Sequence, residues 1–470
     1  MNKSALIKIL MVGCYAFVTS MQITGCANIV PPLGGPRDSL PPYLVVAKPH
    51  DSSVNIQPKE ILIAFNEFIN STSVQENLIV SPTLKNVPLV DAKLNMLKVR
   101  IIDSLQPNTT YSLAFGNAIK DVNEGNIAAN FTYVFSTGDH LDTGTFKGTV
   151  TLAETGKIDT TLIVVLQSAE KDSAIFKEKP LYYTKINGKG KFIFHFLPPK
   201  KYNLFVLPND FNKKYDDSTK FFAFANEPIA IQSQPDSMHL YVFQGAKKAE
   251  KKRVSNNKVA NKVSAGLKYS KNLDGSEQDL LKPLHLIFET PVHLNDSFPI
   301  LLCDTLNHKI AGYQLFIDSA HPETIVIDYP WTAQTKFRVI LPKASIKDSL
   351  NNTLSKTDTL KFVTKSDAFY GSCIIRINGF DEKLNQILQL TQDDKIKYSY
   401  PITKNTIQIE KLPPGDYTLR LLNDTNKNGI WDTGSYYGKQ KKQPEIVQLL
   451  ATPLNIKANW ENELILTINK

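Results

Sequence analysis

KFIFHFLPPKKYNLFVLP, residues 191–208, decides the fold class. Phenylalanine occupies every second position of KFIFHF (191–196), and a Leu-Pro-Pro step separates this run from a second aromatic and aliphatic one. Successive side chains of a strand point to opposite faces, so alternation of this kind indicates strands with one face in a core. The stretch therefore predicts two β-strands joined by a turn.

Similar runs recur along the chain, whereas convincing helical periodicity is absent. They are separated by Pro, Asn, Asp and Gly, which is typical of tandem all-β sandwiches. The clearest are ILIAF (61–65), FTYVF (131–135), TLIVVL (161–166), TIQIE (406–410) and LILTI (464–468). The expected fold class is therefore all-β.

The chain also repeats itself. Residues 197–216 (LPPKKYNLFVLPNDFNKKYD) return as 412–432 (LPPGDYTLRLLNDTNKNGIWD), with Leu-Pro-Pro, a Tyr, a Leu and an Asp-x-Asn step in the same order. Upstream, the Ile-Lys-Asp and Phe-x-Thr steps of 109–137 return within 335–364. Two units, A and B, thus each occur twice, and the predicted plan is A-B-linker-A-B.

The formal net charge of +9 is concentrated in one segment. Residues 246–262 hold seven Lys or Arg and one Glu but no aromatic or large aliphatic residue besides valine. Such a segment cannot bury a core, so we expect an extended, solvated linker, with contact to anionic lipid headgroups as the alternative. With little excess charge elsewhere, no nucleic-acid partner is expected.

Unit A resembles the bacterial Ig-like domain of the SbsA (S-layer) type. The first copy carries Pro49-x-Asp51, ILIAFNEFI (61–69), LQPNTTYSL (105–113), IKDVNEGN (119–126) and FSTG (135–138). The second copy keeps LHLIFETPV (284–292) but lacks the Gly after Asp348. The resemblance implies a β-sandwich for each copy of unit A and no particular activity.

Unit B resembles a prealbumin-like, collagen-adhesin B-type sandwich, through FKGTV (146–150) and the Leu-Pro-Pro…Tyr strand entry. The opening CANIVPPLGGPRDS (26–39) and the Lys/Asn/Ile-rich composition resemble Ig-like lipoproteins of Bacteroidota. The predicted boundaries are a signal peptide (1–25), a Pro/Gly-rich tether (26–42), Ig-like domains at 43–139 and 266–366, prealbumin-like domains at 140–245 and 367–470, and the basic linker (246–265).

The N-terminus predicts a lipoprotein. Lys3 and Lys8 precede an apolar run, Ile9–Val18, that is too short to span a bilayer but long enough for a secretory signal. It leads to Ile-Thr-Gly-Cys26, which resembles the lipobox at which a peptidase cuts before a cysteine that carries the lipid. Cys26 is therefore the predicted lipidated (palmitate-carrying) N-terminus; a chance cysteine after an ordinary signal peptide is the alternative.

The residue after the predicted anchor bears on location. Ala27 stands where an aspartate would retain a Gram-negative lipoprotein at the inner membrane, so we expect an outer-membrane protein attached to lipid through Cys26. Which face of that membrane it occupies stays open. No later apolar stretch has spanning length, so the remainder is expected to be soluble. Cys303 and Cys373 predict no disulfide from their spacing and are expected to be small buried residues.

Known catalytic motifs are missing from the sequence, and the eight histidines are scattered. We therefore expect a non-enzymatic protein of four sandwiches in series, with no cofactor and a structural or protein-binding role in the cell envelope. Such a protein could be accessory to an outer-membrane complex. The alternatives are a carbohydrate-binding or adhesive module, with exposed aromatics aligned on one face, and a hydrolase with a cleft of converging carboxylates.

The stretch DTNKNGIWD (424–432) has two interpretations. Asp424, Asn426, Asn428 and Asp432 match positions 1, 3, 5 and 9 of a calcium loop, with Gly429 at the sharp turn. Ser435 stands where the bidentate Glu would be, so any calcium affinity should be weak. The favoured interpretation is a tight turn capped by Asp424, because the first copy, Asp210 to Asp216, lacks the Asn-Gly step.

Overall fold

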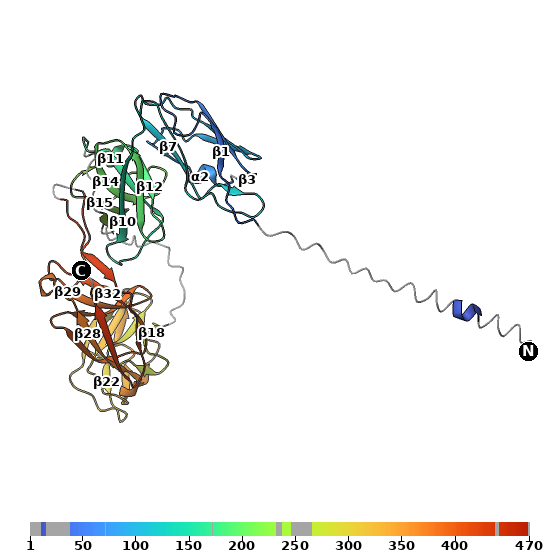
Figure 1. Cartoon of the computed structure of the whole chain (residues 1–470). Coiled ribbons are helices and arrows are strands. Elements are labelled where there is room, and N and C mark those ends of the chain that lie inside the picture. The colour runs from blue at the N-terminus through green and yellow to red at the C-terminus, as the bar shows by residue number, and fades with distance from the viewer. Residues whose placement is uncertain are drawn as a thin grey trace, which may run out of the picture. The chain divides into compact units, whose positions relative to one another are not determined.

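The computed structural model describes residues 11–15, 38–70, 72–171, 173–231, 237–245, 266–437 and 441–468. They divide into two compact units, residues 1–141 and residues 142–470 (Figure 1). Residues 11–15 are helical, and no helix among the described residues is long and apolar enough to cross a membrane. Cys26, the tether up to residue 37 and the basic linker lie outside the described residues.

The all-β prediction is confirmed: tandem β-sandwiches account for the regular structure. The six β-branched and aromatic runs chosen from the sequence all lie on strands. We number the sandwiches domain 1 (β1–β9), domain 2 (β10–β17), domain 3 (β18–β27) and domain 4 (β28–β35). Each has its own hydrophobic cluster, and domain 1 forms the first unit whereas domains 2 to 4 form the second.

Domain 1 packs two main sheets against each other. One has the order β1-β2-β6-β5 and the other β4-β7-β9, with the short pair β3-β8 beside them. The elements are β1 (Leu44–Lys48), β2 (Glu60–Phe65), β3 (Ile69–Asn70), α2 (Val74–Asn77), β4 (Ile79–Ser81), β5 (Leu89–Lys93), β6 (Met96–Arg100), β7 (Thr110–Gly116), β8 (Lys120–Asp121) and β9 (Phe131–Ser136). In β2, Ile61, Ile63 and Phe65 alternate into the core, as period two requires.

Domain 2 has the strand order β12-β11-β14-β15-β17-β10-β13, with β16 paired to β14. Its first strand pairs antiparallel with β13 and parallel with the last strand, β17. The elements are β10 (Gly144–Leu152), β11 (Leu162–Ser168), α3 (Ala174–Lys177), β12 (Tyr182–Lys185), β13 (Lys191–Leu197), β14 (Lys201–Pro208), β15 (Phe221–Phe224), β16 (Ile229–Ala230) and β17 (Met238–Gln244). Figure 1 shows β11, β14 and β15 in neighbouring positions.

Domain 3 repeats the two-sheet plan of domain 1. Its sheets are β18-β20-β24-β23 and β19-β27-β25-β22, with β21 paired to β26. The strands are β18 (Tyr269–Lys271), β19 (Glu277–Gln278), β20 (Leu284–Phe288), β21 (Val292–Leu294), β22 (Leu301–Cys303), β23 (Gln314–Ile317), β24 (Thr324–Asp328), β25 (Lys336–Leu341), β26 (Ile346–Asp348) and β27 (Asp358–Thr364).

Domain 4 repeats the topology of domain 2, since its first strand, β28, pairs antiparallel with β31 and parallel with the last strand, β35. Its sheets are β31-β28-β35 and β30-β29-β32-β33, with β34 paired to β32. The elements are η1 (Asp367–Phe369), β28 (Gly371–Asn378), η2 (Glu382–Leu384), β29 (Gln386–Gln392), β30 (Lys395–Pro401), β31 (Thr406–Leu412), β32 (Gly415–Asn423), β33 (Ile446–Leu449), β34 (Leu454–Ile456) and β35 (Glu461–Thr467).

Candidate functional site

The stretch predicted to be a calcium loop or a turn leads from β32 into a long loop, residues 424–445, that ends at β33. Asp424 is buried, and its two carboxylate oxygens accept hydrogen bonds from the backbone N–H of Asn428 at 3.2 Å and of Gly429 at 2.8 Å. Gly429 has φ +81°, which a residue without a side chain adopts at no steric cost. These contacts form the capped turn that the sequence favoured.

The other predicted ligands also meet inside this turn. The side-chain amides of Asn426 and Asn428 both donate to Oδ2 of Asp432, the second at 2.9 Å. Glu445, which we did not predict, holds the loop at its far end. Its Oε1 accepts from the backbone N–H and the hydroxyl of Thr425, both at 2.7 Å, and its Oε2 from the N–H of Asp432 at 3.1 Å.

The four predicted ligands are thus brought together, each engaged in a hydrogen bond of the turn. Among the described residues, no group of three or more His, Cys, Asp or Glu side chains is arranged to hold a metal ion. Weak calcium binding at Asp424, Asn426, Asn428 and Asp432 stays a prediction that a titration can test. Glu445 could have been noticed as a later carboxylate, but nothing in its spacing distinguished it.

Beyond the turn, the loop contacts domain 2. The hydroxyl of Thr433 donates to the carbonyl of Gln244 at 2.7 Å, and that of Tyr437 donates to the carbonyl of Tyr215 at 2.9 Å. The side-chain amide of Gln443 donates to the carbonyl of Phe224 at 3.0 Å. We call residues 431–437 and 441–443 the docking loop, because they join segments that lie about two hundred positions apart in the chain.

The docking loop fits an aromatic surface on the outer side of the domain 2 sheet. The ring of Tyr436 lies 4.9 Å from Phe224, 5.0 Å from Phe222 and 5.6 Å from Phe205, measured between centroids. Tyr437 lies 4.9 Å from Tyr215. Burial, followed by the charges of Tyr437 and Asp217, raises the pKa of Tyr215, so its hydroxyl stays protonated. Tyr436 and its partners on domain 2 belong to a hydrophobic cluster separate from the domain 2 core, and Tyr437 lies at its exposed margin.

A second contact joins the same two domains. The backbone N–H of Val447, on the edge strand β33, donates to the carbonyl of Ala153 at 2.8 Å. Gly156 has φ +69°, and a Cβ there would lie 2.6 Å from the backbone nitrogen of Leu449. Nζ of Lys157 lies 2.6 Å from a carboxylate oxygen of Asp394. The turn after β10 thus covers β33, the edge strand of the domain 4 sheet, whose backbone groups would otherwise be unpaired.

Arg420 lies buried on the outer face of the domain 4 sheet that includes β33. Its Nη2 donates to the carbonyl of Asp394 at 3.1 Å, while its Nε has no hydrogen-bond partner among the described residues. Burial lowers the pKa of the guanidinium, and the charges of Asp394 and Glu154 oppose that effect. The guanidinium is buried beside the contact between domains 2 and 4. Partial separation of the two domains would leave this cation desolvated and incompletely paired, which is unfavourable.

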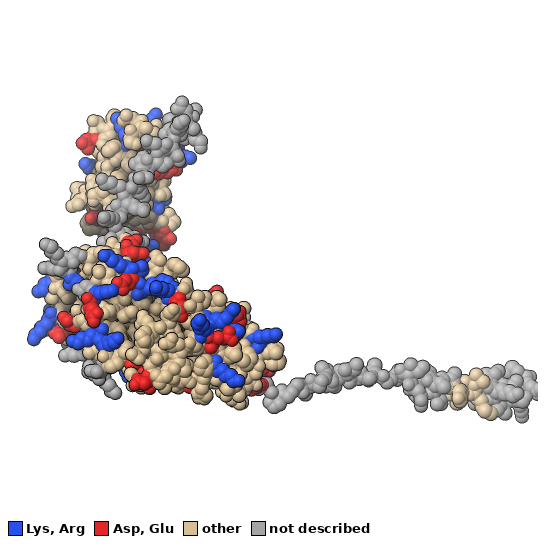
Figure 2. All heavy atoms as spheres, turned by 90° about the horizontal axis from the view of Figure 1, so that it is seen from above, with Lys and Arg blue, Asp and Glu red and all other residues tan. Residues whose placement is uncertain are grey.

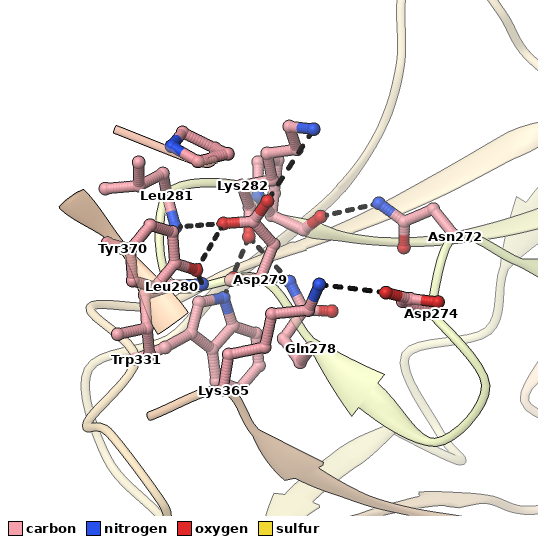
Figure 3. Close-up of polar contacts among 12 residues, drawn as sticks. Asn272, Asp274, Gln278, Asp279, Leu280, Leu281, Lys282, Trp331, Lys365 and Tyr370 are labelled. Atoms are coloured by element: carbon pink, nitrogen blue, oxygen red, sulfur yellow. Dashed lines mark hydrogen bonds and ion pairs between the residues drawn. The ribbon is translucent and has the colours of Figure 1, made fainter. Parts of the chain in front are cut away.

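Figure 3 shows the polar contacts that join domain 3 to domain 4. The hydroxyl of Tyr370, just before β28, donates to Oδ1 of Asp279 at 2.7 Å and accepts from the N–H of Leu280 at 2.7 Å. The Lys365 side chain is 8% exposed, and its Nζ lies 2.9 Å from Oδ2 of Asp274. That ammonium also lies 3.7 Å from the ring centroid of Phe369.

Side chains of domain 3 order the segment that receives Tyr370. The side-chain amide of Gln278 donates to the carbonyl of Lys282 at 2.7 Å, and the indole N–H of Trp331 donates to the same carbonyl at 3.0 Å (Figure 3). The ion pair with Lys365 lowers the pKa of Asp274. Domain 4 is therefore joined to domain 3 through hydrogen bonds and to domain 2 through the docking loop.

The cysteines and an open groove are the remaining candidates for a functional site. Cys26, the predicted lipid carrier, lies outside the described residues. Cys303 and Cys373 are buried and free, as expected, and burial raises the pKa of the Cys373 thiol to about 11. An open groove of about 680 Å³ lies on domain 3, lined by Leu267, Lys268, Tyr269, Ser270, Lys271, Leu354, Ser355, Lys356 and Asp358.

Comparison with known proteins identifies the first domain. Residues 38–137 match the family model of the bacterial Ig-like domain (Big_5). Domain 1 is a bacterial Ig-like domain. This agrees with the resemblance drawn from unit A. No curated protein matches the chain.

Solved structures with some similarity include S-layer and pilus proteins. The N-terminal part of the bacterial S-layer protein SbsC aligns at 12% identity and a TM-score of 0.17, over 44% of this chain and 45% of that one. The S-layer protein rSbsC(31-844) aligns at 11% and 0.16, over 88% and 54%. The T6 backbone pilin of Streptococcus pyogenes aligns at 10% and 0.15, over 66% and 80%. The chain thus spans about half the length of the S-layer proteins it matches.

Proposed function

We propose that the protein is a lipid-anchored, non-catalytic envelope protein that holds a partner protein at the outer membrane. The observation that carries the proposal is the docking of domain 4 on domain 2, together with the contacts between domains 3 and 4. Three domains then present their surfaces in a fixed relation, which favours binding a partner through several contacts at once. Attachment through Cys26 and an outer-membrane location belong to the proposal.

The distribution of exposed side chains supports holding a protein over binding a glycan. The exposed aromatic residues of the domains, which could stack on sugars, are distributed over all four of them: Tyr43, Phe68, Phe211, Phe298, Phe316, Tyr437 and Trp460. Figure 2 shows Lys, Arg, Asp and Glu interspersed with uncharged residues on the face it displays. Mixed charges of this kind are common at the rims of protein interfaces.

The test is affinity purification from detergent-solubilised membranes. We expect the wild-type protein to retain an envelope protein, and the pair Tyr436→Asp and Tyr437→Asp, which breaks docking, to retain much less of it. Phe316→Asp, an exposed phenylalanine on domain 3, is the matched control. Equal recovery with the docking variant would contradict the role of docking. No partner with the wild type, together with saturable glycan binding, would favour the adhesive alternative.

The anchor has its own test. Cys26→Ala should move the protein from the detergent phase to the aqueous phase in a phase-partition experiment, with an unchanged melting curve, because the acyl chains supply most of the membrane affinity. Unchanged partition would rule out lipidation at this residue.

A further inference from the structure

Domain 1 carries a group of exposed apolar side chains at the end where the described chain enters it. Leu40, Tyr43, Phe68, Leu94 and Val122 are 69%, 63%, 56%, 60% and 56% exposed. We call these five residues the apolar tip. Exposed apolar residues are ordinary when scattered, but a group of them marks a surface that contacts something apolar.

Backbone contacts link the segments that carry Tyr43, Phe68, Leu94 and Val122, while Leu40 follows Asp38, whose carbonyl accepts from the side-chain amide of Asn126 at 3.1 Å. The N–H of Val122 donates to the carbonyl of Phe68 at 3.1 Å, and the N–H of Ile69 donates to the carbonyl of Leu94 at 2.9 Å. The N–H of Asn66 donates to the carbonyl of Tyr43 at 3.2 Å. Separate segments of the chain thus meet around β3, which Figure 1 labels within domain 1.

Leu94 is at an unusual position. It lies at the tip of the β5–β6 hairpin with φ +57°, a conformation that Gly or Asn adopts far more readily than leucine. The side chain of Leu94 is 60% exposed, so its burial within domain 1 offsets little of this strain. Departures from local conformational preference that bring no compensating stabilisation are concentrated at functional sites.

We propose that the apolar tip inserts into the interfacial region of the bilayer that carries the lipid anchor. The inference rests on the proposed anchor at Cys26. Residues 27–37 separate Cys26 from Asp38 and, fully extended, span on the order of 40 Å, so this end of domain 1 cannot lie far from the membrane surface. The apolar tip consists of hairpin and strand ends, and such segments can enter a fluid lipid surface that offers no complementary pocket.

The chemistry of the tip fits a lipid surface. Tyr43 and Phe68 provide rings of the kind enriched at membrane interfaces, and Leu40 and Leu94 provide aliphatic groups for the acyl boundary. Lys93, next to Leu94, and Lys120, which pairs with Asn70 in the β3–β8 ladder, are exposed beside the tip. Lysines beside an apolar surface add electrostatic attraction to anionic headgroups.

The test removes the anchor so that the tip acts alone. The full mature chain with Cys26→Ser is sedimented with vesicles of phosphatidylcholine and phosphatidylglycerol. We expect measurable binding, reduced roughly tenfold or more by Phe68→Asp with Leu94→Asp, because charged groups are excluded from the acyl region. Phe211→Asp, at an 88% exposed phenylalanine on domain 2, should bind as the parent does.

Several outcomes would overturn the proposal. They are undiminished vesicle binding by the double variant, an equal loss with Phe211→Asp, or no binding by the parent protein. If the double variant instead loses an envelope protein in affinity purification, the tip is a protein-docking surface. If the double variant fails to fold, the variant Tyr43→Ser with Leu40→Ser replaces it in the vesicle experiment. Failure of the anchor itself appears separately, as aqueous partition of the wild-type protein.

Discussion

Single residues decide how closely domain 4 approaches domain 2. Gly434 and Gly156 both stand where any side chain would collide with the other domain. A Cβ on Gly434 would lie 2.8 Å from the Phe243 ring, and one on Gly156 would meet backbone atoms of β33. Close packing of this kind tolerates no added atoms, so these positions can be used to separate the domains without altering either core.

The first prediction concerns Gly434. Gly434→Val should lower the free energy of unfolding by about 1–3 kcal/mol, because overpacking pushes the docking loop from the aromatic surface. Chemical denaturation followed by tryptophan fluorescence measures this. Gly188→Val is the matched control, since no atom lies within 4 Å of a Cβ built there. Equal destabilisation by both variants would mean that the loop is not tightly packed.

The second prediction concerns acid. Burial opposes ionisation of the Asp121 carboxylate, but hydrogen bonds from the backbone N–H groups of Gly125, Glu124 and Asn126 outweigh it and lower its pKa below 3.8. A carboxyl whose pKa is lower in the folded state stabilises the fold above the unfolded pKa. That stabilisation is lost as the pH falls through the folded pKa.

The melting transition of domain 1, followed by calorimetry, should therefore move to lower temperature on acidification below about pH 4. Asp121→Asn should lower the transition at pH 7 and reduce its pH dependence. Asp91→Asn, at an exposed carboxylate of the same domain, is the control. A pH profile left unchanged by Asp121→Asn would show that other carboxyls govern acid unfolding.

At the scale of elements, the sequence predicted strands well and the docking loop not at all. The runs ILIAF and KFIFHF correspond to β2 and β13, in which every second side chain is buried, because a sheet with one buried face imposes period two on burial. The docking loop has no such period. Tyr436 contacts Phe222 on β15, and Tyr437 contacts Tyr215 in the loop before β15. Both partners lie about two hundred residues earlier, and nothing local in Thr-Gly-Ser-Tyr-Tyr (433–437) indicates them.

The turn that precedes the docking loop is the subject of the third prediction. Because both carboxylate oxygens of Asp424 already accept backbone N–H groups, we expect millimolar calcium to leave the melting midpoint unchanged. If calcium binds instead, a concentration ten times the dissociation constant would stabilise domain 4 by about 1.4 kcal/mol. That gain should vanish in Asp424→Asn, and magnesium at the same ionic strength is the control.

For the whole molecule, the sequence predicted four β-sandwich domains in series but not the contact between the second and the fourth. The sequence shows the repeat and the basic segment between its halves, but contacts between distant domains depend on surface shape, which periodicity does not encode. The contacts of Thr433, Tyr437 and Gln443 with domain 2 join the second half of the chain to the first. Domain 1 forms the other compact unit.

The fourth prediction follows from this contact. Brief trypsin treatment should cut among the lysines and arginines between Lys247 and Lys262, giving two fragments by denaturing electrophoresis. On size-exclusion chromatography under native conditions the fragments should elute together, because the docking loop still binds domain 2. Tyr436→Asp with Tyr437→Asp should separate them. Separate elution of the wild-type fragments would show that docking needs the covalent link.

The docking loop also restricts how a chain of this kind can evolve. Two copies of an A-B pair produced by duplication begin as interchangeable parts, and losing one would leave the other whole. Once the loop of the second copy covers aromatic rings of the first, a deletion of domain 4 bares Phe222, Phe224 and Tyr215 to water and to neighbouring chains. The halves have become mutually dependent, so truncated descendants should be rare unless the aromatic surface is lost with them.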